Sequence, residues 1–344
     1  MTISDIKPPA VDPALVGMMN AVLREYRESH PPVNTIERDA DLWRHLDDLG
    51  LVRLTGDEKS GGSGAGWFDA AELHAATARH AVRVPLPEND LLACWLLDAN
   101  GMPSDNAVRT ACLLDAHGKA RGVPWASGSD RIVVVWPDGV GYRAADVDAG
   151  ALEITPGTNL IGEPRDTVSA DVSALGGVTV ADDLVRQLRL KSAMIRAIQV
   201  CAALDQIVVS SVEHVGSRVQ FGRALSRFQA VQNLIADSAA EAALARAATE
   251  AALSTAVASD WSATNLQFHI AVARSCAGHA TSVVVRNAHQ VHGAIGTTHE
   301  HRLHELTRAA LAWRSEFGSV RYWDEQVTDV ALAVGAEMWR LIAD

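Results

Sequence analysis

Apolar residues recur at the spacing of amphipathic helices over most of the chain, with one interruption near its middle. In the first part this spacing predicts helices at about residues 13–28, 35–49, 69–82 and 89–97, with Gly50 as a C-terminal helix signal. A brief extended piece is expected at residues 51–54, and a glycine-rich loop at residues 60–66. We therefore expect an N-terminal α-helical domain over residues 1–105.

The pattern changes at about Ala107, where short runs rich in β-branched residues begin. They cover residues 108–114, 131–136, 152–155 and 177–180, and turn sequences such as Pro137-Asp138-Gly139 separate them. This predicts a small, mostly antiparallel β domain over residues 106–181.

Helical spacing returns at about Asp182 and continues to the end. It predicts one helix with an apolar face from Met194 to Val215, then helices at about 228–259, 260–291, 301–316 and 320–342. Three of these are long enough, at 1.5 Å per residue, for an elongated four-helix bundle. The predicted fold is mainly α with a small β domain, and the bundle forms a C-terminal domain over residues 182–344.

Composition narrows the class of protein. The formal net charge of -12 argues against a nucleic-acid binder, which needs a basic face. Four widely spaced cysteines predict reduced core thiols in the cytoplasm. The first ten residues have no basic and apolar pattern of a secretory signal, and no stretch approaches the roughly 20 apolar residues of a membrane span.

The histidine-rich segment at residues 299–304 does not predict a metal site. A zinc-binding His-Glu-x-x-His helix would need histidine where Leu303 stands. His301 and His304 could share a helix face, but that spacing alone is weak. No metal is expected.

Residues 217–232 concentrate positive charge at a junction between two predicted helices. Arg218, Arg223 and Arg227 lie there, and Phe221-Gly222 interrupts the helical pattern. Guanidinium groups bind phosphate oxygens in bidentate fashion, so a pyrophosphate-containing ligand would suit this corner. A solvated turn whose arginines pair with acids is an equally open interpretation.

Two further pairs could contact a ligand. Trp125 and Ser127 stand on alternate residues of an expected strand, where an indole and a hydroxyl could flank a planar ligand, or where the indole could simply cover a core. Gln229 and Gln290 could each present an amide to a polar ring or a ribityl chain.

Taken together, the motifs resemble those of the acyl-CoA dehydrogenase family, over nearly the whole chain. The segments that carry the resemblance are Arg218-Val219-Gln220-Phe221-Gly222, Phe228-Gln229-Ala230-Val231-Gln232, and Gln290-Val291-His292-Gly293-Ala294-Ile295-Gly296 followed by Thr298-His299-Glu300-His301, with Trp125-Ala126-Ser127 as a weaker match. The order of helical domain, β domain and bundle is also that of the family.

The resemblance implies an FAD-dependent enzyme that removes hydrogens from the α and β carbons of an acyl-CoA thioester. It implies that Arg218 and Phe221 reach the FAD of a neighbouring subunit, with Arg218 at the pyrophosphate. Gln229, Gln290 and Gly293 would lie along the same cofactor. Trp125 and Ser127 would lie by the flavin ring of their own subunit.

The chain departs from the family at the catalytic base. A glutamate is expected either early in the first bundle helix or in a loop between the last helices, and ungapped counting places Ser192 and Phe317 at these positions. Glu316 is one residue away and is the weak candidate for the base. The β domain is also shortened, since residues 109–115 pass on without the family's flavin-contacting segment.

These departures favour the diverged subunit of an α2β2 heterotetramer, as in enzymes that desaturate steroid side-chain CoA thioesters. A second acyl-CoA dehydrogenase-like subunit would supply the base, and an electron-transfer flavoprotein or equivalent would accept the electrons. Two alternatives stay open. One is a self-sufficient homotetramer that uses Glu316; the other is a non-catalytic structural relative without flavin.

Overall fold

The computed structural model describes residues 11–31 and 36–343. They divide into two compact units. Of the described residues, the sheet unit comprises 21–31, 36–74 and 82–192, and the bundle unit comprises 11–20, 75–81 and 193–343. The boundary between the units passes through three helices, α1 (Pro13–Ser29), α3 (Trp67–His80) and α5 (Asp182–Ser217). The three predicted domains stay predictions.

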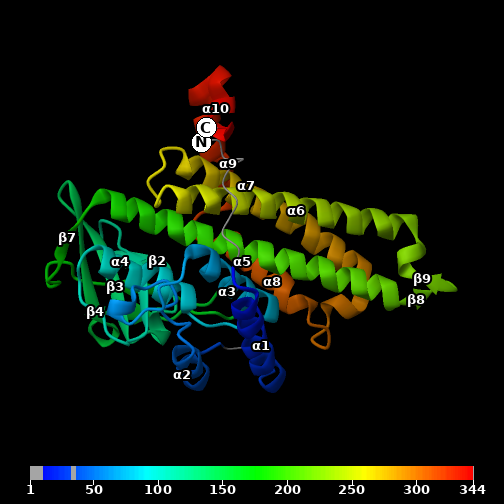
Figure 1. Ribbon diagram of the computed structural model, residues 1–344, viewed down its shortest axis with the longest axis horizontal. Helices are drawn as coiled ribbons and strands as arrows, with labels where there is room; N and C mark the ends of the chain where they lie inside the picture. The colour runs from blue at the N-terminus through cyan, green and yellow to red at the C-terminus, as the bar shows by residue number, and fades with distance from the viewer. Residues whose placement is uncertain (1–10, 32–35, 344) are drawn as a thin grey trace. The chain divides into compact units, whose positions relative to one another are not determined.

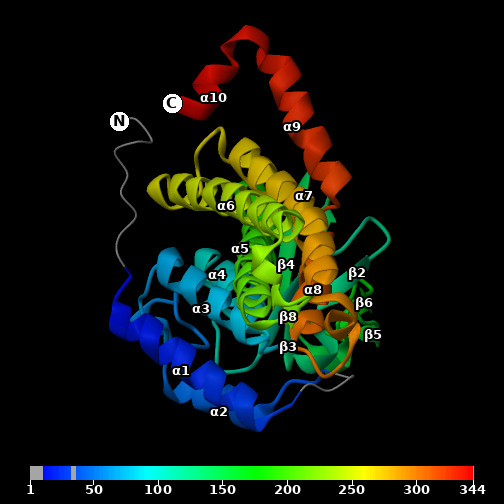
Figure 2. The same ribbon diagram turned by 90° about the vertical axis from the view of Figure 1, so that its right-hand side faces the viewer.

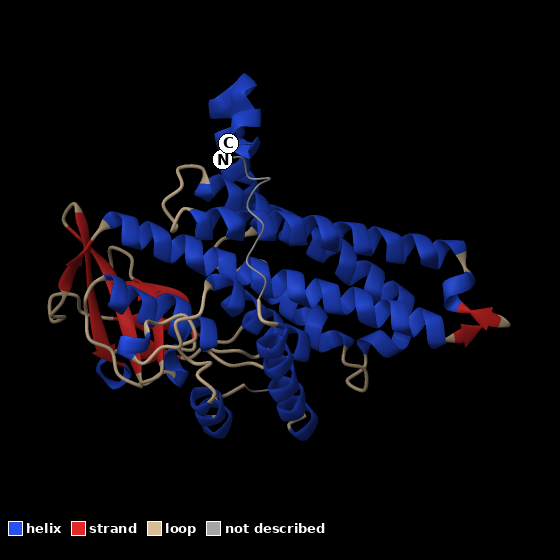
Figure 3. Ribbon diagram, in the orientation of Figure 1, coloured by secondary structure: helices blue, strands red, loops and turns tan. Residues whose placement is uncertain are grey.

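Two small sheets form the centre of the sheet unit (Figure 3). One has the order β1-β3-β4-β7, with strands Arg109–Leu113, Arg131–Asp138, Gly141–Asp148 and Val178–Val180. The other has the order β2-β6-β5, with strands Lys119–Pro124, Arg165–Ser169 and Glu153–Thr155. Only the β1–β3 pair among these strands is parallel, so the prediction of a mostly antiparallel region is confirmed.

One apolar core joins residues from both sheets. Its buried members are Cys112, Leu114, Ala120, Val123, Ala126, Ile132, Val134, Trp136, Ala145 and Val168. The predicted strands β1, β3, β5 and β7 are present, whereas β2, β4 and β6 were not predicted. Those three strands carry charged or small residues and few large apolar ones, so their apolar signal is short and easily missed. Only β6 buries alternate residues; in β4 the neighbours Ala144 and Ala145 are both buried.

The helices of the sheet unit differ from prediction in three places. The predicted start of the second helix, at residue 35, lies outside the described residues, as does the N-terminal segment 1–10. The observed helix α2 spans Ala40–Asp48, and Asp39 caps its first turn. The extended piece predicted at residues 51–54 is wrong, since this segment forms turns. The helix predicted at 89–97 is a π-helix, Glu88–Cys94, continued by α4 (Trp95–Ala99).

Three long helices dominate the bundle unit (Figure 1). They are α5, α6 (Gln229–Ala258) and α7 (Leu266–His292). Small side chains such as Ala245, Ala252 and Ala256 are fully buried on α6, which allows close packing against α7. The third helix begins later than predicted, because Asp260 and Trp261 both take left-handed backbone angles, with φ of 48° and 62°.

Shorter helices complete the bundle unit. They are α8 (Leu303–Trp313), α9 (Val320–Val334) and α10 (Met338–Ala343). α9 packs on α7, where Ser275 Oγ donates to Asp324, and then leads on to α10 (Figure 2). The single helix predicted over residues 320–342 is wrong, because Gly335 has φ of 56° and interrupts it.

Helix α5 is long and apolar enough to cross a membrane when judged by length and composition alone. Of its most apolar window, 78% is buried within the protein, and the core helix of a bundle meets the same criterion. The four cysteines are free, and Cys94, Cys112 and Cys201 are buried, as predicted.

A buried carboxyl group in the π-helix makes stability depend on pH. Asp90 Oδ2 accepts the Thr55 backbone N–H at 3.0 Å, whereas no hydrogen-bond partner of Oδ1 is found in residues 11–31 and 36–343. Burial raises the pKa of Asp90 to about 6. A folded pKa above the unfolded value of about 3.9 means that folding disfavours the charged form, so stability is lost as pH rises through this range.

We compare the free energy of unfolding of Asp90→Asn with that of wild type. The variant's value minus the wild-type value should be more positive at pH 7 than at pH 4, by up to about 3 kcal/mol. Urea unfolding of both proteins at pH 4, 5, 6 and 7 would measure the difference. The asparagine amide is buried at every pH, so its cost shifts all points equally, and only the pH dependence tests the interpretation. A difference that does not change between pH 4 and 7 would contradict it.

Candidate functional site

The cationic junction predicted at residues 217–232 is a small β-hairpin at the end of α5 (Figure 1). Strands β8 (Val219–Gln220) and β9 (Arg223–Ala224) pair antiparallel. Phe221 and Gly222 form its two-residue loop, with φ of 54° and 80°. Positive φ at both positions is typical of a type I′ turn, which matches the twist of the flanking strands. Glycine takes this conformation without strain, but phenylalanine does not.

The hairpin presents its ligand-binding candidates to solvent. Phe221 is 87% exposed, and Arg218 is exposed, with no ion-pair partner among the residues that the structure describes. Arg223 is engaged instead, since its guanidinium lies 4.1 Å from the centre of the Phe228 ring. Arg218 and Arg227 are therefore both placed to receive an outside anion, and no acid in the described chain neutralises either of them.

The other motif residues of the bundle unit are also exposed. Gln229 is the first residue of α6, and Gln290 lies in the last turn of α7. Gly293 follows α7 with φ of 62°, which ends the helix. The ends of α5 and α7 meet, because the imidazoles of His214 and His292 stack with centroids 4.4 Å apart. Arg218 and Gly293 thus each lie within four residues, along the chain, of the contact between His214 and His292.

Trp125 and Ser127 do not lie side by side on a strand, so that geometric expectation is wrong. Strand β2 ends at Pro124, and Trp125 has φ of 59°. Ser127 belongs to a short 3-10 helix, Ala126–Gly128. The Trp125 side chain is buried, with 2% exposed, whereas Ser127 is exposed. The indole covers a core, as the second interpretation of the sequence had it.

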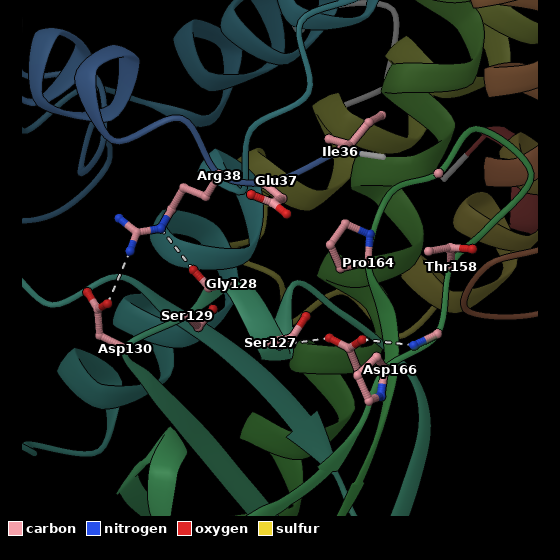
Figure 4. Close-up of a pocket in the computed structure, with 13 residues that line it drawn as sticks. Ile36, Glu37, Arg38, Ser127, Gly128, Ser129, Asp130, Thr158, Pro164 and Asp166 are labelled. Atoms are coloured by element: carbon pink, nitrogen blue, oxygen red, sulfur yellow. Dashed lines mark hydrogen bonds and ion pairs between the residues drawn. The ribbon is translucent and has the colours of Figure 1, made fainter. Parts of the chain in front are cut away.

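Ser127 lines a cavity of about 520 Å³ in the sheet unit (Figure 4). Asp166, which is buried, accepts the Ser127 backbone N–H at 2.7 Å and the Gly157 backbone N–H at 3.1 Å. Arg38 donates to the Gly128 carbonyl and pairs with Asp130 at 3.1 Å. The backbone donor of Ser127 is therefore already occupied, and the one arginine that lines the cavity is neutralised.

Neither position aligned with a catalytic base carries a free carboxylate. Ser192 is buried in α5, and its hydroxyl donates to the Leu188 carbonyl at 2.7 Å. Phe317 follows α8, with φ of 54°. Its neighbour Glu316 accepts a hydrogen bond from Arg196 Nε at 2.6 Å, and Arg196 is only 1% exposed.

A second buried arginine holds the backbone of the same loop. Arg274 on α7 donates to the carbonyl oxygens of Arg314, Glu316 and Gly318, at 3.0, 2.7 and 3.4 Å. Burial lowers the pKa of Arg274 to about 10, and the nearby Arg196 lowers it further, while Glu316 acts in the opposite direction. The loop that carries Glu316 is thus fixed at its backbone by one guanidinium and at its side chain by another.

The sequence interpretation missed Arg196, Arg274 and Asp166. The two arginines did leave a signal, since each interrupts an apolar run inside a long helix, at Ala193–Ile198 and Ala271–Ala277. A charged residue at such a position must find a partner within the fold. The partners lie more than 100 and about 40 residues away in sequence, so the pattern alone does not identify them.

Comparison with known proteins agrees with this description. Residues 176–322 match the model of the acyl-CoA dehydrogenase C-terminal domain. The chain is 27% identical to acyl-CoA dehydrogenase IpdE2 of Mycobacterium tuberculosis, over 88% of this chain and 87% of that protein. It is 29% identical to IpdE2 of Mycolicibacterium smegmatis, over 76% of this chain and 79% of that protein.

Solved structures show the same fold. The ChsE4-ChsE5 complex of Mycobacterium tuberculosis superposes with a TM-score of 0.81, covering 95% of this chain and 99% of that chain at 20% identity. A variant of the Tcur3481-Tcur3483 steroid ACAD gives 0.79, covering 93% and 98% at 22% identity. The chain has the acyl-CoA dehydrogenase fold, and its residues 176–322 match the C-terminal domain of the acyl-CoA dehydrogenases.

Proposed function

We propose that this chain is a subunit of an FAD-dependent acyl-CoA dehydrogenase that introduces an α,β double bond into a CoA thioester. It acts in an α2β2 heterotetramer whose other subunit supplies the catalytic glutamate. The observation that carries the proposal is the 2.6 Å contact between Arg196 and Glu316, because it occupies the carboxylate nearest to the family's base position.

The exposed residues of the bundle unit fit part of an FAD molecule. Arg218 offers an unpaired guanidinium for the pyrophosphate, while Gln229 and Gln290 offer amides. All three are exposed, which suits a cofactor held against a second subunit. Bound FAD would accept a hydride from the substrate β-carbon.

The sheet unit fits the flavin ring less well. Trp125 is buried beneath the surface, and the Ser127 N–H is bonded to Asp166. A flavin at this cavity would meet exposed Glu37 and paired Arg38 rather than free donors (Figure 4). This contrast supports a chain that completes the FAD site of a partner and does not hold a full site of its own.

A base must remove the α-proton while the hydride leaves. Glu316 is a poor base here, because a buried guanidinium stabilises its charged form and its loop cannot move without breaking the bonds from Arg274. Ser192 has no neighbouring acid that would activate it among the contacts of the described chain, since its hydroxyl bonds to a carbonyl.

Relatives support the proposed assembly and substrate. The chain resembles IpdE2, which is named an acyl-CoA dehydrogenase, and two of the structural matches are two-component assemblies, one of them a steroid ACAD. From these relatives we propose a steroid-derived acyl-CoA as substrate. An electron-transfer flavoprotein or equivalent as acceptor and a cytoplasmic location are proposed from the sequence alone.

We expect Glu316→Gln to keep at least about a third of the activity of the heteromeric enzyme, since a base supplied by the partner is untouched, whereas loss of a true general base costs about 10²–10⁴-fold. Glu325→Gln is the matched control, because Glu325 pairs with Arg321 on the surface of α9 at 2.7 Å. Steady-state turnover at equal FAD content measures the effect. Abolished turnover with FAD still bound would assign the base to Glu316 and reject the proposal.

Expression tests the need for a partner. The chain purified alone should be colourless or poorly folded, and it should be yellow and active when co-expressed with a related subunit that carries the glutamate. Flavin absorbance and subunit stoichiometry measure this. A yellow, active homotetramer of this chain alone would overturn the heteromeric proposal, and a colourless but stable complex would favour the flavin-free relative.

Arg218→Ala should lower the affinity of the complex for FAD by about 10–100-fold, because a hydrogen bond to a charged group contributes about 1.5–3 kcal/mol. Arg227→Ala is the control, since Arg227 is equally exposed in the same segment. FAD titration of the apo complex followed by flavin fluorescence gives both constants. Equal effects of the two substitutions would show that only the net charge of the segment matters.

A further inference from the structure

Three histidines from distant parts of the sequence meet in the bundle unit. His214 lies in the last turn of α5, His292 is the last residue of α7, and His301 lies in the turn before α8. One ring nitrogen of each lies within 4.8 Å of those of the other two. His292 stacks on His214, and His301 meets the His292 ring edge-on with centroids 4.8 Å apart.

His292 has one nitrogen with nothing to bind. Its Nδ1 donates to the Ala288 carbonyl at 2.8 Å, which leaves the lone pair on Nε2. The residue is 5% exposed, and Nε2 is buried with no hydrogen-bond partner within residues 11–31 and 36–343. Such an unpaired buried atom is unfavourable, and a ligand that accepts the lone pair would remove the cost.

The pattern at His292 is also the one that metal-binding histidines use. In such sites one ring nitrogen binds the ion, while the other N–H donates to a backbone carbonyl or a carboxylate and fixes the ring. Burial lowers the pKa of His292 to about 4 and also lowers the pKa of His214. Metals bind the neutral imidazole, and burial favours that form of both rings.

We propose that His214, His292 and His301 form a binding site for a divalent transition-metal ion of the zinc type, with three imidazole ligands and one open position. Imidazole suits Zn²⁺, Co²⁺, Ni²⁺ and Cu²⁺, and three histidines leave room for a water or an anion. The site lies beside the residues proposed for FAD, since His292 stands between Gln290 and Gly293, but the proposal does not depend on bound FAD.

His214 and His301 must both adjust. The His214 ring stacks on His292 at an interplanar angle of 24°, so it must tilt before its in-plane lone pair and that of His292 can meet at one ion. A tetrahedral site with Zn–N bonds of about 2.0–2.1 Å needs nitrogens about 3.3 Å apart, which is closer than the present 4.8 Å limit. His301 Nδ1 now accepts the Leu303 N–H at 3.1 Å. Coordination through the other nitrogen would place a proton on Nδ1 and release Leu303 N–H, one of the first-turn donors of α8 that need no intrahelical partner.

The charges around the cluster permit a cation. No carboxylate is among the groups that shift the pKa of His214 or His292, and the neighbouring positive group is Arg218. Arg218 is exposed, so solvent screens its repulsion. A bound ion would tie the end of α5 to the ends of the segments around Gly293 and Leu303, and would steady the base of the hairpin.

The test uses the full chain without an affinity tag, co-expressed with its partner subunit if solubility requires it, and stripped with a chelator. Titration with Co²⁺ should give one equivalent per chain with the visible absorption of a tetrahedral site, and Zn²⁺ should displace it. His292→Gln and His301→Gln should each abolish that absorption. His279→Gln on α7, an exposed histidine paired with Asp324, should retain it.

Circular dichroism separates a lost site from a lost fold. His301 lies in a turn, so His301→Gln should stay folded even if His292→Gln does not. Saturating Zn²⁺ should raise the melting temperature of wild type and of His279→Gln, and should leave that of His301→Gln unchanged. Absence of stoichiometric Co²⁺ binding in wild type, or binding that persists in folded His301→Gln, would overturn the proposal.

Discussion

The loop between α8 and α9 depends on charge buried between helices. Arg196 on α5 and Arg274 on α7 are both almost fully buried, and both bond to Glu316, one through its carboxylate and one through its carbonyl. A buried guanidinium is costly unless most of its donors are bonded, and the loop supplies those partners, although Arg274 Nε has none among the described residues. Both arginines therefore depend on the loop. These contacts fix the segment where the family places a catalytic base, and they use the available carboxylate for structure.

The ligand-binding candidates of the bundle unit are exposed, in contrast to the buried and paired groups around Glu316. The hairpin after α5 leaves Arg218 without an acid in the described chain and holds Phe221 in solvent on a left-handed turn. If these groups were buried within the chain, an outside ligand could not contact them. The exposed turn is unfavourable, because the Phe221 backbone is strained and its apolar ring is in water. These ligand-binding candidates are exposed, whereas the carboxylate nearest the base position is ion-paired. Both features fit the proposed subunit that completes a neighbour's site.

Much of the fold follows from periodicity. The long helices α5 and α6, the strands β1 and β3 and the hairpin interruption at Phe221-Gly222 all lie where apolar spacing and glycine placement predict them. The failures have local causes. Strands β4 and β6 hold few large apolar residues, and Gly335 interrupts the last predicted helix. Trp125 takes a left-handed angle that ends β2 before the indole and the Ser127 hydroxyl can align.

The order of helical and β segments follows from the sequence alone, as do the motifs that resemble those of the family and the absence of a carboxylate at the two aligned base positions. Tertiary structure set the contact partners of the polar side chains. It paired Glu316 with Arg196, placed Asp166 on the Ser127 N–H, and gathered His214, His292 and His301 from helix ends far apart in the chain. Periodicity reports which face of a segment is buried, but the partner of a buried polar group comes from another segment, and only packing brings the two together.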